Sequence, residues 1–189
     1  MKALILKYAA MTLLLLMAVV CSFGIPRREL RATAQVAGIA LDEENGRIYA
    51  TFELYSPALD APIGSERQTV KTCGTNLQEC IDRAQLVGGE SLFADDAAVL
   101  IVGSGNETLM IEKIKTHYRQ LKNDRMDLPV FFTLDQSASS IFEGEGAVLS
   151  GELAESANAV GQVQTVRDLM NATGQRVRIK GEGSYEIIS

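Results

Sequence analysis

The hydrophobic pattern separates an apolar N-terminal stretch from a body in which apolar and polar segments alternate. No charged residue lies between Ala9 and Val20. In the body, apolar and polar residues alternate along 48–54, which predicts a half-buried strand. Asn45-Gly46, the strongest short hairpin signal, precedes this strand. We therefore expect residues 35–41 to form its antiparallel partner.

Further strands and helices follow at irregular intervals. Residues 67–73 predict a third strand, after which Thr75 and Gln78 form a capping box that begins a helix. The unbroken apolar run 97–102 predicts a strand covered on both faces. Residues 106–122 have the periodicity of an amphipathic helix. The other predicted elements are a strand at 129–134, a short helix at 137–142, helical pieces at 152–158 and 165–170, and a strand pair within 175–188.

The early hairpin and the irregular order of elements favour an α+β fold over a strictly doubly wound one. We predict a mixed, mainly antiparallel sheet with packed helices, preceded by an N-terminal hydrophobic signal or anchor helix. After Leu149 the composition shifts towards Ala, Gly, Ser and Gln. We therefore divide the chain into a leader (1–24), an α+β domain (25–150) and a helical connector with a terminal strand pair (151–189).

The apolar N-terminal stretch is preceded by two positive charges, Lys2 and Lys7, and by no acid. This pattern is typical of an export signal. Without residues 1–21, 16 of the 18 basic residues and all 24 acidic residues remain, so the net charge changes from −6 to −8. An acidic body argues against nucleic acid as a partner and against a polybasic membrane-binding patch.

Three fates of the leader are open. Cys21 ends the apolar run, where a bacterial lipoprotein carries its acylated cysteine, although Val20 stands where a lipobox prefers a small residue. A signal peptidase could instead cut after Ser22 or Gly24. An uncleaved anchor over 9–25 is the third alternative. We rank lipidation of Cys21 first, and each alternative places the body outside the cytoplasm.

A glycine-containing turn follows the apolar run 97–102. Gly103-Ser104-Gly105 lies where a nucleotide-binding turn would lie, but Thr108 occupies the position of the third glycine of that motif. We interpret the segment as a tight turn before a helix capped by Asn106. An exported enzyme or small-molecule binder that uses the Gly103–Gly105 turn is the alternative.

Other candidate chemistry in the sequence is sparse. Asp42-Glu43-Glu44 and Asp95-Asp96 lack the spacing of an EF-hand, so we interpret them as solvated turn acids. His117 is the only histidine and has no second imidazole with which to share a metal ion. No G-x-S-x-G motif occurs. The sequence therefore predicts no catalytic residues, no metal and no cofactor.

The two remaining cysteines are Cys73 and Cys80. Their spacing is not that of a usual zinc site. Cys80 shares a helical face with Leu77, Ile81 and Ala84, which predicts a buried thiol. An exported compartment also permits a Cys73–Cys80 disulfide.

In order along the chain, these segments resemble the Ger(x)C family, the lipoprotein C subunits of bacterial spore germinant receptors. The motifs that carry the resemblance are Cys21 at the end of the leader, Arg28-Glu29-Leu30, the glycine-containing strand 34–42 that ends in aspartate, the hairpin and strand 45–57, Gly74-Thr75-Asn76-Leu77, the strands 99–103 and 129–134, and the late helix 162–171. The similarity spans about residues 13–180. It corresponds to the N-terminal domain of a family whose members usually continue into further domains.

The resemblance implies a non-enzymatic, membrane-anchored protein that acts in spore germination. Cys21 would carry the lipid, with palmitate as the expected fatty acid, and Arg28, Glu29 and Leu30 would form a membrane-proximal motif. The implied partners are the integral-membrane A and B subunits of the receptor. The implied location is the inner spore membrane, with the body on the non-cytoplasmic side.

Overall fold

The chain forms two compact units, Met1–Ala32 and Thr33–Ser189, in a computed structural model. The structure describes residues 11, 33–55, 67–88, 91–121, 125–143, 150–161, 163–174, 176–180 and 184–188. Of the first unit this includes Met11 alone, so the predicted leader and residues Cys21, Arg28, Glu29 and Leu30 lie outside the described residues.

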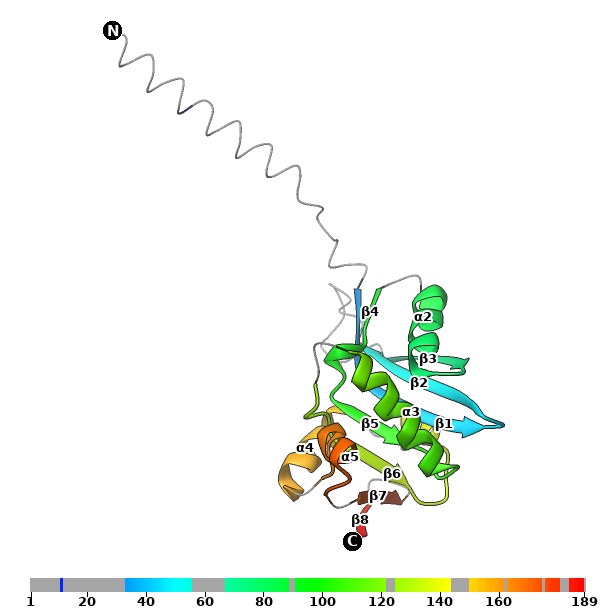
Figure 1. The fold of residues 1–189 in the computed structure, drawn as a ribbon. Helices are drawn as coiled ribbons and strands as arrows, with labels where there is room; N and C mark the ends of the chain where they lie inside the picture. Colours follow the sequence, from blue (N-terminus) through cyan, green and yellow to red (C-terminus); the bar gives the residue numbers. More distant parts are fainter. Residues whose placement is uncertain are drawn as a thin grey trace. The chain divides into compact units, whose positions relative to one another are not determined.

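The second unit is built on one mixed sheet with helices on both faces (Figure 1). Its elements are β1 (Thr33–Glu44), β2 (Arg47–Tyr55), β3 (Arg67–Gly74), α2 (Leu77–Gly88), β4 (Ser91–Phe93), the 3-10 helix η2 (Ala94–Asp96), β5 (Val99–Val102), α3 (Glu107–Gln120), β6 (Val130–Thr133), the 3-10 helix η3 (Ala138–Phe142), α4 (Ser150–Val160), α5 (Val166–Asn171), β7 (Arg176–Lys180) and β8 (Ser184–Ile188).

The strand order is β3-β2-β1-β5-β6-β7-β8, and β4 pairs with the beginning of β1. The pairs β1–β2, β2–β3 and β7–β8 are antiparallel, and β1–β2 and β2–β3 form the longest ladders. The inner pairs β1–β5, β5–β6 and β6–β7 are parallel. The predicted α+β fold on a mixed sheet is therefore confirmed.

The hairpin between β1 and β2 turns at Asn45-Gly46, as predicted. Both residues have positive φ, 53° and 79°, and the Gly46 N–H donates to the Glu43 carboxylate at 2.6 Å. Two positive φ values in a two-residue loop match the right-handed twist of the flanking strands. The turn thereby fixes the register in which Ile39 lies opposite Phe52.

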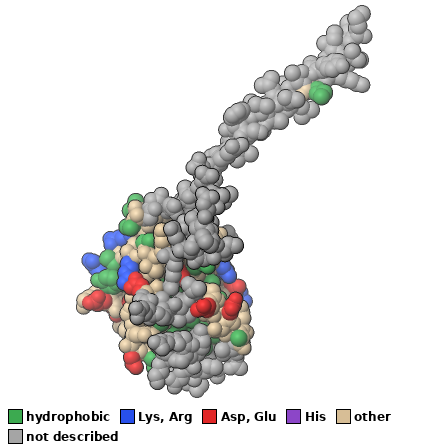
Figure 2. Space-filling view, turned by 180° about the vertical axis from the view of Figure 1, so that it is seen from behind, with side chains coloured by type: hydrophobic (Ala, Val, Ile, Leu, Met, Phe, Trp, Pro, Cys, Tyr) green, Lys and Arg blue, Asp and Glu red, His purple; other side chains and the backbone are tan. Residues whose placement is uncertain are grey.

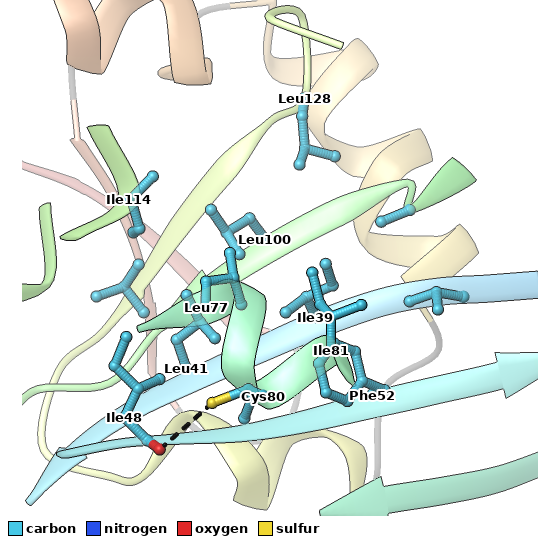
Figure 3. Close-up of a cluster of buried hydrophobic side chains, with 14 of the residues drawn as sticks. Ile39, Leu41, Ile48, Phe52, Leu77, Cys80, Ile81, Leu100, Ile114 and Leu128 are labelled. Carbon is cyan, nitrogen blue, oxygen red and sulfur yellow. Dashed lines mark hydrogen bonds between the residues drawn. The ribbon is translucent and has the colours of Figure 1, made fainter. Parts of the chain in front are cut away.

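One face of the sheet is covered by α2, α3 and α5, which pack on a large apolar core (Figure 3). The inner face of α2 is the predicted one, with Leu77, Cys80 and Ala84 at most 1% exposed. The helix is capped differently from the prediction. The Asn76 side chain accepts from the Glu79 N–H, and the Glu79 carboxylate accepts from the Thr75 N–H, so Gln78 takes no part.

The opposite face is covered by η3 and α4, whose apolar side chains form a second, smaller cluster with residues of β1, β5, β6 and β7. Val99–Val102 is buried throughout, because β5 lies at the centre of the sheet with helices on either side. Residues 151–188 contribute α4, α5, β7 and β8 to the same unit. The composition shift after Leu149 therefore coincides with the start of α4 and not with a boundary between packing units.

Candidate functional site

The parallel strands β1, β5 and β6 bring three loops together at one edge of the sheet. Leu41 pairs with Val102, and Val102 pairs with Phe132, so the segments after these residues lie side by side. We call this the carboxyl edge. Loops at the carboxyl ends of parallel strands commonly form the ligand sites of sheets with helices on both faces. Here the loops are the β1–β2 hairpin, the Gly103–Gly105 turn and residues 135–139.

A cavity of about 630 Å³ lies at the carboxyl edge. A volume of roughly 300–1,000 Å³ is usual for small-molecule sites. The hairpin contributes Asp42, Glu43 and Glu44, and the turn contributes Ser104 and Gly105. The rest of the lining consists of Tyr49, Ala50, Thr51, Lys71, Thr72, Cys73, Asp135, Gln136, Ser137 and Ser139.

Asp42 ties β1 to η3 across this edge. Its carboxylate accepts from the Ala138 N–H at 2.6 Å, the Ser139 N–H at 3.0 Å and the Ser137 hydroxyl at 3.3 Å. Free N–H groups at a helix start favour a negative acceptor, and such charge-assisted bonds are stronger than neutral ones. Our interpretation of Asp42 as a solvated turn acid is therefore wrong. The Ser137 side chain itself makes no capping hydrogen bond to η3.

Gly103 leaves the space that the Asp42 carboxylate occupies. A Cβ atom at Gly103 would overlap the Asp42 Oδ1 atom. The Ser104 hydroxyl donates to the Gln136 carbonyl at 3.3 Å, and the Asn106 side chain caps α3 by accepting from the Leu109 N–H at 3.1 Å. The prediction of a tight turn capped by Asn106 is confirmed. The first glycine of the turn is required for packing against a carboxylate.

A second carboxylate on the same face makes an equivalent contact with α4. Glu53 on β2 is 2% exposed and accepts from both the N–H and the hydroxyl of Ser150, the first residue of α4. Gly38 on β1 lies beneath this pair, and a Cβ atom there would overlap Ser150 Oγ. The local sequence pattern does not predict this arrangement. An acid within the alternating strand 48–54 is a local sign of a buried polar contact, but its partner, Ser150, lies 97 residues away.

Cys73 on β3 and Cys80 on α2 lie in different surroundings. Cys73 is opposite Tyr49 on β2 and lines the cavity, whereas the buried Cys80 thiol donates to the Ile48 carbonyl at 3.6 Å (Figure 3). Both are free thiols in the structure, so the disulfide that the compartment permits is not formed. Burial raises the pKa of Cys80 to about 11. The predicted buried thiol at Cys80 is confirmed.

The other candidate residues lie away from the cavity. His117 is buried on α3, where its ring packs edge-to-face against Tyr118. Within the described ranges no three His, Cys, Asp or Glu side chains are grouped as a metal site would need. A second cavity, of about 700 Å³, lies between α2 and α3 and is lined by polar helix residues that include Gln78, Asp82 and Thr116.

On the face drawn in Figure 2, basic and acidic side chains are interspersed. Among the residues that the structure describes, no helix has both the length and the apolar character needed to cross a membrane. Comparison of the chain with protein-family models, curated proteins and solved structures finds no match.

Proposed function

We propose that this chain is a non-enzymatic, membrane-anchored component of a bacterial spore germinant receptor. It would act on the non-cytoplasmic side of the inner spore membrane and contact the integral-membrane A and B subunits. Cys21 would carry a fatty acid, and Arg28, Glu29 and Leu30 would follow near the membrane. The observation that carries the proposal is the ordered set of motifs that resembles the Ger(x)C family.

The structure gives the most distinctive of these motifs a physical reason. The strand motif 34–42 becomes β1, and its glycine and its final aspartate are the residues that admit α4 and hold η3. Gly74-Thr75-Asn76-Leu77 becomes the capped start of α2, and the late helix motif contains α5. Each of these motifs stabilises a specific contact or helix end in the same packed unit. This supports the proposal that the chain shares its fold with the family. The motifs support the receptor role only through that resemblance.

Co-purification tests the receptor role. The full chain, carrying a C-terminal epitope tag, is isolated from spore membranes in mild detergent, and the A and B subunits are detected in the eluate. We expect both subunits with the wild-type chain. Asp42→Ala is the comparison variant, because it loosens η3 and leaves the leader unchanged. It shows whether recovery of the subunits depends on an intact body. Absence of both subunits from the wild-type eluate would contradict the proposal.

Metabolic labelling tests the anchor separately. Cells that express the full chain are grown with a radiolabelled fatty acid, and the wild type is compared with Cys21→Ala. We expect label on the wild type only, since a lipoprotein is acylated through its cysteine thiol. Cys73→Ala is the matched control and should retain the label. Equal labelling of wild type and Cys21→Ala would exclude lipidation at Cys21.

The cavity at the carboxyl edge favours one second candidate, an exported small-molecule-binding protein. Its size and its place beside the Gly103–Gly105 turn motivate this alternative. A thermal-shift screen of amino acids, sugars and nucleosides tests it, with Gly105→Val as the variant that narrows the cavity. At Gly105 an added Cβ would meet only the Glu43 carbonyl oxygen, at 3.2 Å, so the variant should fold. A ligand that stabilises the wild type but not Gly105→Val would favour this candidate.

A further inference from the structure

The end of the sheet opposite the carboxyl edge carries exposed apolar side chains. We call it the amino edge, because β1 begins there. Tyr55 is 50% exposed, Leu86 83% and Val87 72%. Among the described residues of the second unit, the other large apolar side chain that is comparably exposed is Tyr49, which lines the cavity. Large exposed apolar side chains that gather at one place often mark an interaction surface.

The strand registers place these three residues at the same edge. Tyr55 ends β2 opposite Gln35, near the beginning of β1. The helix α2 begins after Gly74, which pairs with Ile48 at the far end of the sheet. It ends just before β4, which pairs with Thr33–Gln35. Figure 1 shows the end of α2 and β4 beside the start of β1. Tyr55 and the end of α2 lie on opposite faces of the sheet, so together they border the edge from both sides.

The last turn of α2 continues its apolar stripe beyond the core. Val87 follows Cys80 and Ala84 at helical spacing, and both of those residues are fully buried. Val87 nevertheless remains mostly exposed, and the neighbouring Leu86 is the most exposed large apolar side chain among the described residues of the unit. Core packing among these described residues therefore does not account for apolar residues at either position.

The covalent connection to the leader favours one occupant for this edge, the bilayer that would hold the anchor. The chain enters β1 at Thr33, and only residues 21–32 separate that strand from the apolar stretch Ala9–Val20. Twelve residues span at most about 40 Å when fully extended. If the leader is anchored as proposed above, the amino edge is the part of the unit that is tethered at the bilayer.

The chemistry of Tyr55 agrees with a bilayer as the occupant of this edge. Tyrosine, with an apolar ring and a polar hydroxyl, is enriched where protein meets the headgroup region.

We infer that the amino edge, through Tyr55, Leu86 and Val87, rests on the headgroup region of the lipid bilayer that holds the anchor. This inference depends on the membrane anchor of the proposed function. It adds that the body lies on the membrane in one orientation, with the cavity at the carboxyl edge open to the solvent.

Single-tryptophan fluorescence tests the inference, because the chain contains no tryptophan. Leu86→Trp in the full lipidated chain is reconstituted in phosphatidylcholine–phosphatidylglycerol vesicles, with or without brominated acyl chains. Glu44→Trp, at the carboxyl edge, is the matched control. We expect bromine to quench Leu86→Trp and its emission to shift to shorter wavelength, while Glu44→Trp is unaffected. Val87→Trp provides a second probe with the same expected result.

The contrary outcomes are distinguishable. If both variants float with the vesicles but Leu86→Trp and Val87→Trp are as unquenched as Glu44→Trp, the docked edge is wrong and the anchor stands. If the wild-type chain does not float, the anchor fails and the inference fails with it. Shielding of Leu86→Trp from aqueous iodide only after the A and B subunits are added would show that a protein covers this edge, which also overturns the inference.

Discussion

The two faces of the sheet are held by different kinds of contact. On the face of α2, α3 and α5, side chains such as Phe52, Leu77 and Ile114 fill an apolar core. On the face of η3 and α4, the apolar cluster is smaller, and two carboxylates hold the starts of the two helices. Each carboxylate contact lies beside a glycine whose missing side chain makes the approach possible.

The difference shows how this chain positions its cavity. Apolar packing is non-directional and tolerates small shifts, whereas a carboxylate that accepts two N–H bonds fixes a helix start in one place. The Asp42 contact holds residues 137–139, of which Ser137 and Ser139 line the cavity at the carboxyl edge. We therefore expect substitutions on the first face to change stability and substitutions on the second to change the shape of the carboxyl edge as well.

The largest effect should come from truncation in the apolar core. Phe52 is fully buried, and Phe52→Ala should lower the free energy of unfolding by about 3–5 kcal/mol. Tyr49→Ala, on the same strand but the opposite face, is the matched control and should cost about 1 kcal/mol or less. Urea unfolding of the second unit measures both. Equal losses would contradict the assignment of the main core to the α2 face.

On the face covered by η3 and α4, a methyl group added at Gly38 tests the close approach of α4 to β1. Gly38→Ala should destabilise the unit by about 2–3 kcal/mol, because the Cβ overlaps Ser150 and meets the Phe142 ring. Gly151→Ala, at an open position in α4, should be neutral or stabilising by up to about 1 kcal/mol. Thermal unfolding distinguishes them. A Gly38→Ala variant as stable as Gly151→Ala would mean that α4 does not pack on β1 as described.

Removal of the Asp42 carboxylate should have a smaller effect on stability. Asp42→Ala leaves the N–H groups of Ala138 and Ser139 without their acceptor and should cost about 1–2 kcal/mol. Hydrogen exchange should show faster exchange at 138–142, with little change in α2. Glu44→Ala, an exposed neighbour, is the control, and an equal effect of the two variants would contradict the role of Asp42.

The reactivity of the two thiols compares a partly exposed cysteine, Cys73, with a buried one, Cys80, and requires no substitution. Cys73 should react with iodoacetamide in the native protein at pH 8, whereas Cys80 should react only after unfolding, since it is buried and its pKa is about 11. Mass spectrometry of the peptides separates the two sites. Native alkylation of Cys80 at the rate of Cys73 would contradict the burial of its thiol.

The same raised pKa gives a pH dependence. In the unfolded chain the Cys80 thiol ionises near its ordinary pKa of 9.0, but in the folded protein it ionises near 11. Between these values the unfolded state binds fewer protons, so the free energy of unfolding should fall as pH rises. Cys80→Ala removes this contribution and should show a shallower decline in alkaline urea titrations. Identical slopes would contradict the raised pKa.

The apolar face could be predicted from the sequence because its information is local. The periodicity of Leu77, Cys80, Ile81 and Ala84 and the Asn45-Gly46 turn each specify an element within a dozen residues. The cap of α2 differs from the predicted one, because Gln78 and Glu79 both lie within reach of a helix start and spacing alone does not choose between them.

The carboxylate contacts could not be predicted in the same way. Asp42 and Ser139 are 97 residues apart, as are Glu53 and Ser150, so nothing in the local pattern links them. An acid at the end of a strand has the same sequence signature whether it is solvated or caps a helix. The Gly103–Gly105 turn lies where the sequence predicts it. The need for glycine at position 103 depends on Asp42, which comes beside it only through the pairing of β1 with β5.

The proposed role in spore germination has one direct test. Spores from a strain that lacks this gene are challenged with a panel of germinants, and the release of dipicolinic acid is followed over time. We expect a slowed or absent response to at least one germinant, restored by the wild-type gene and not by Cys21→Ala. Germination that is unchanged with every germinant tried would contradict the role of this protein in the receptor.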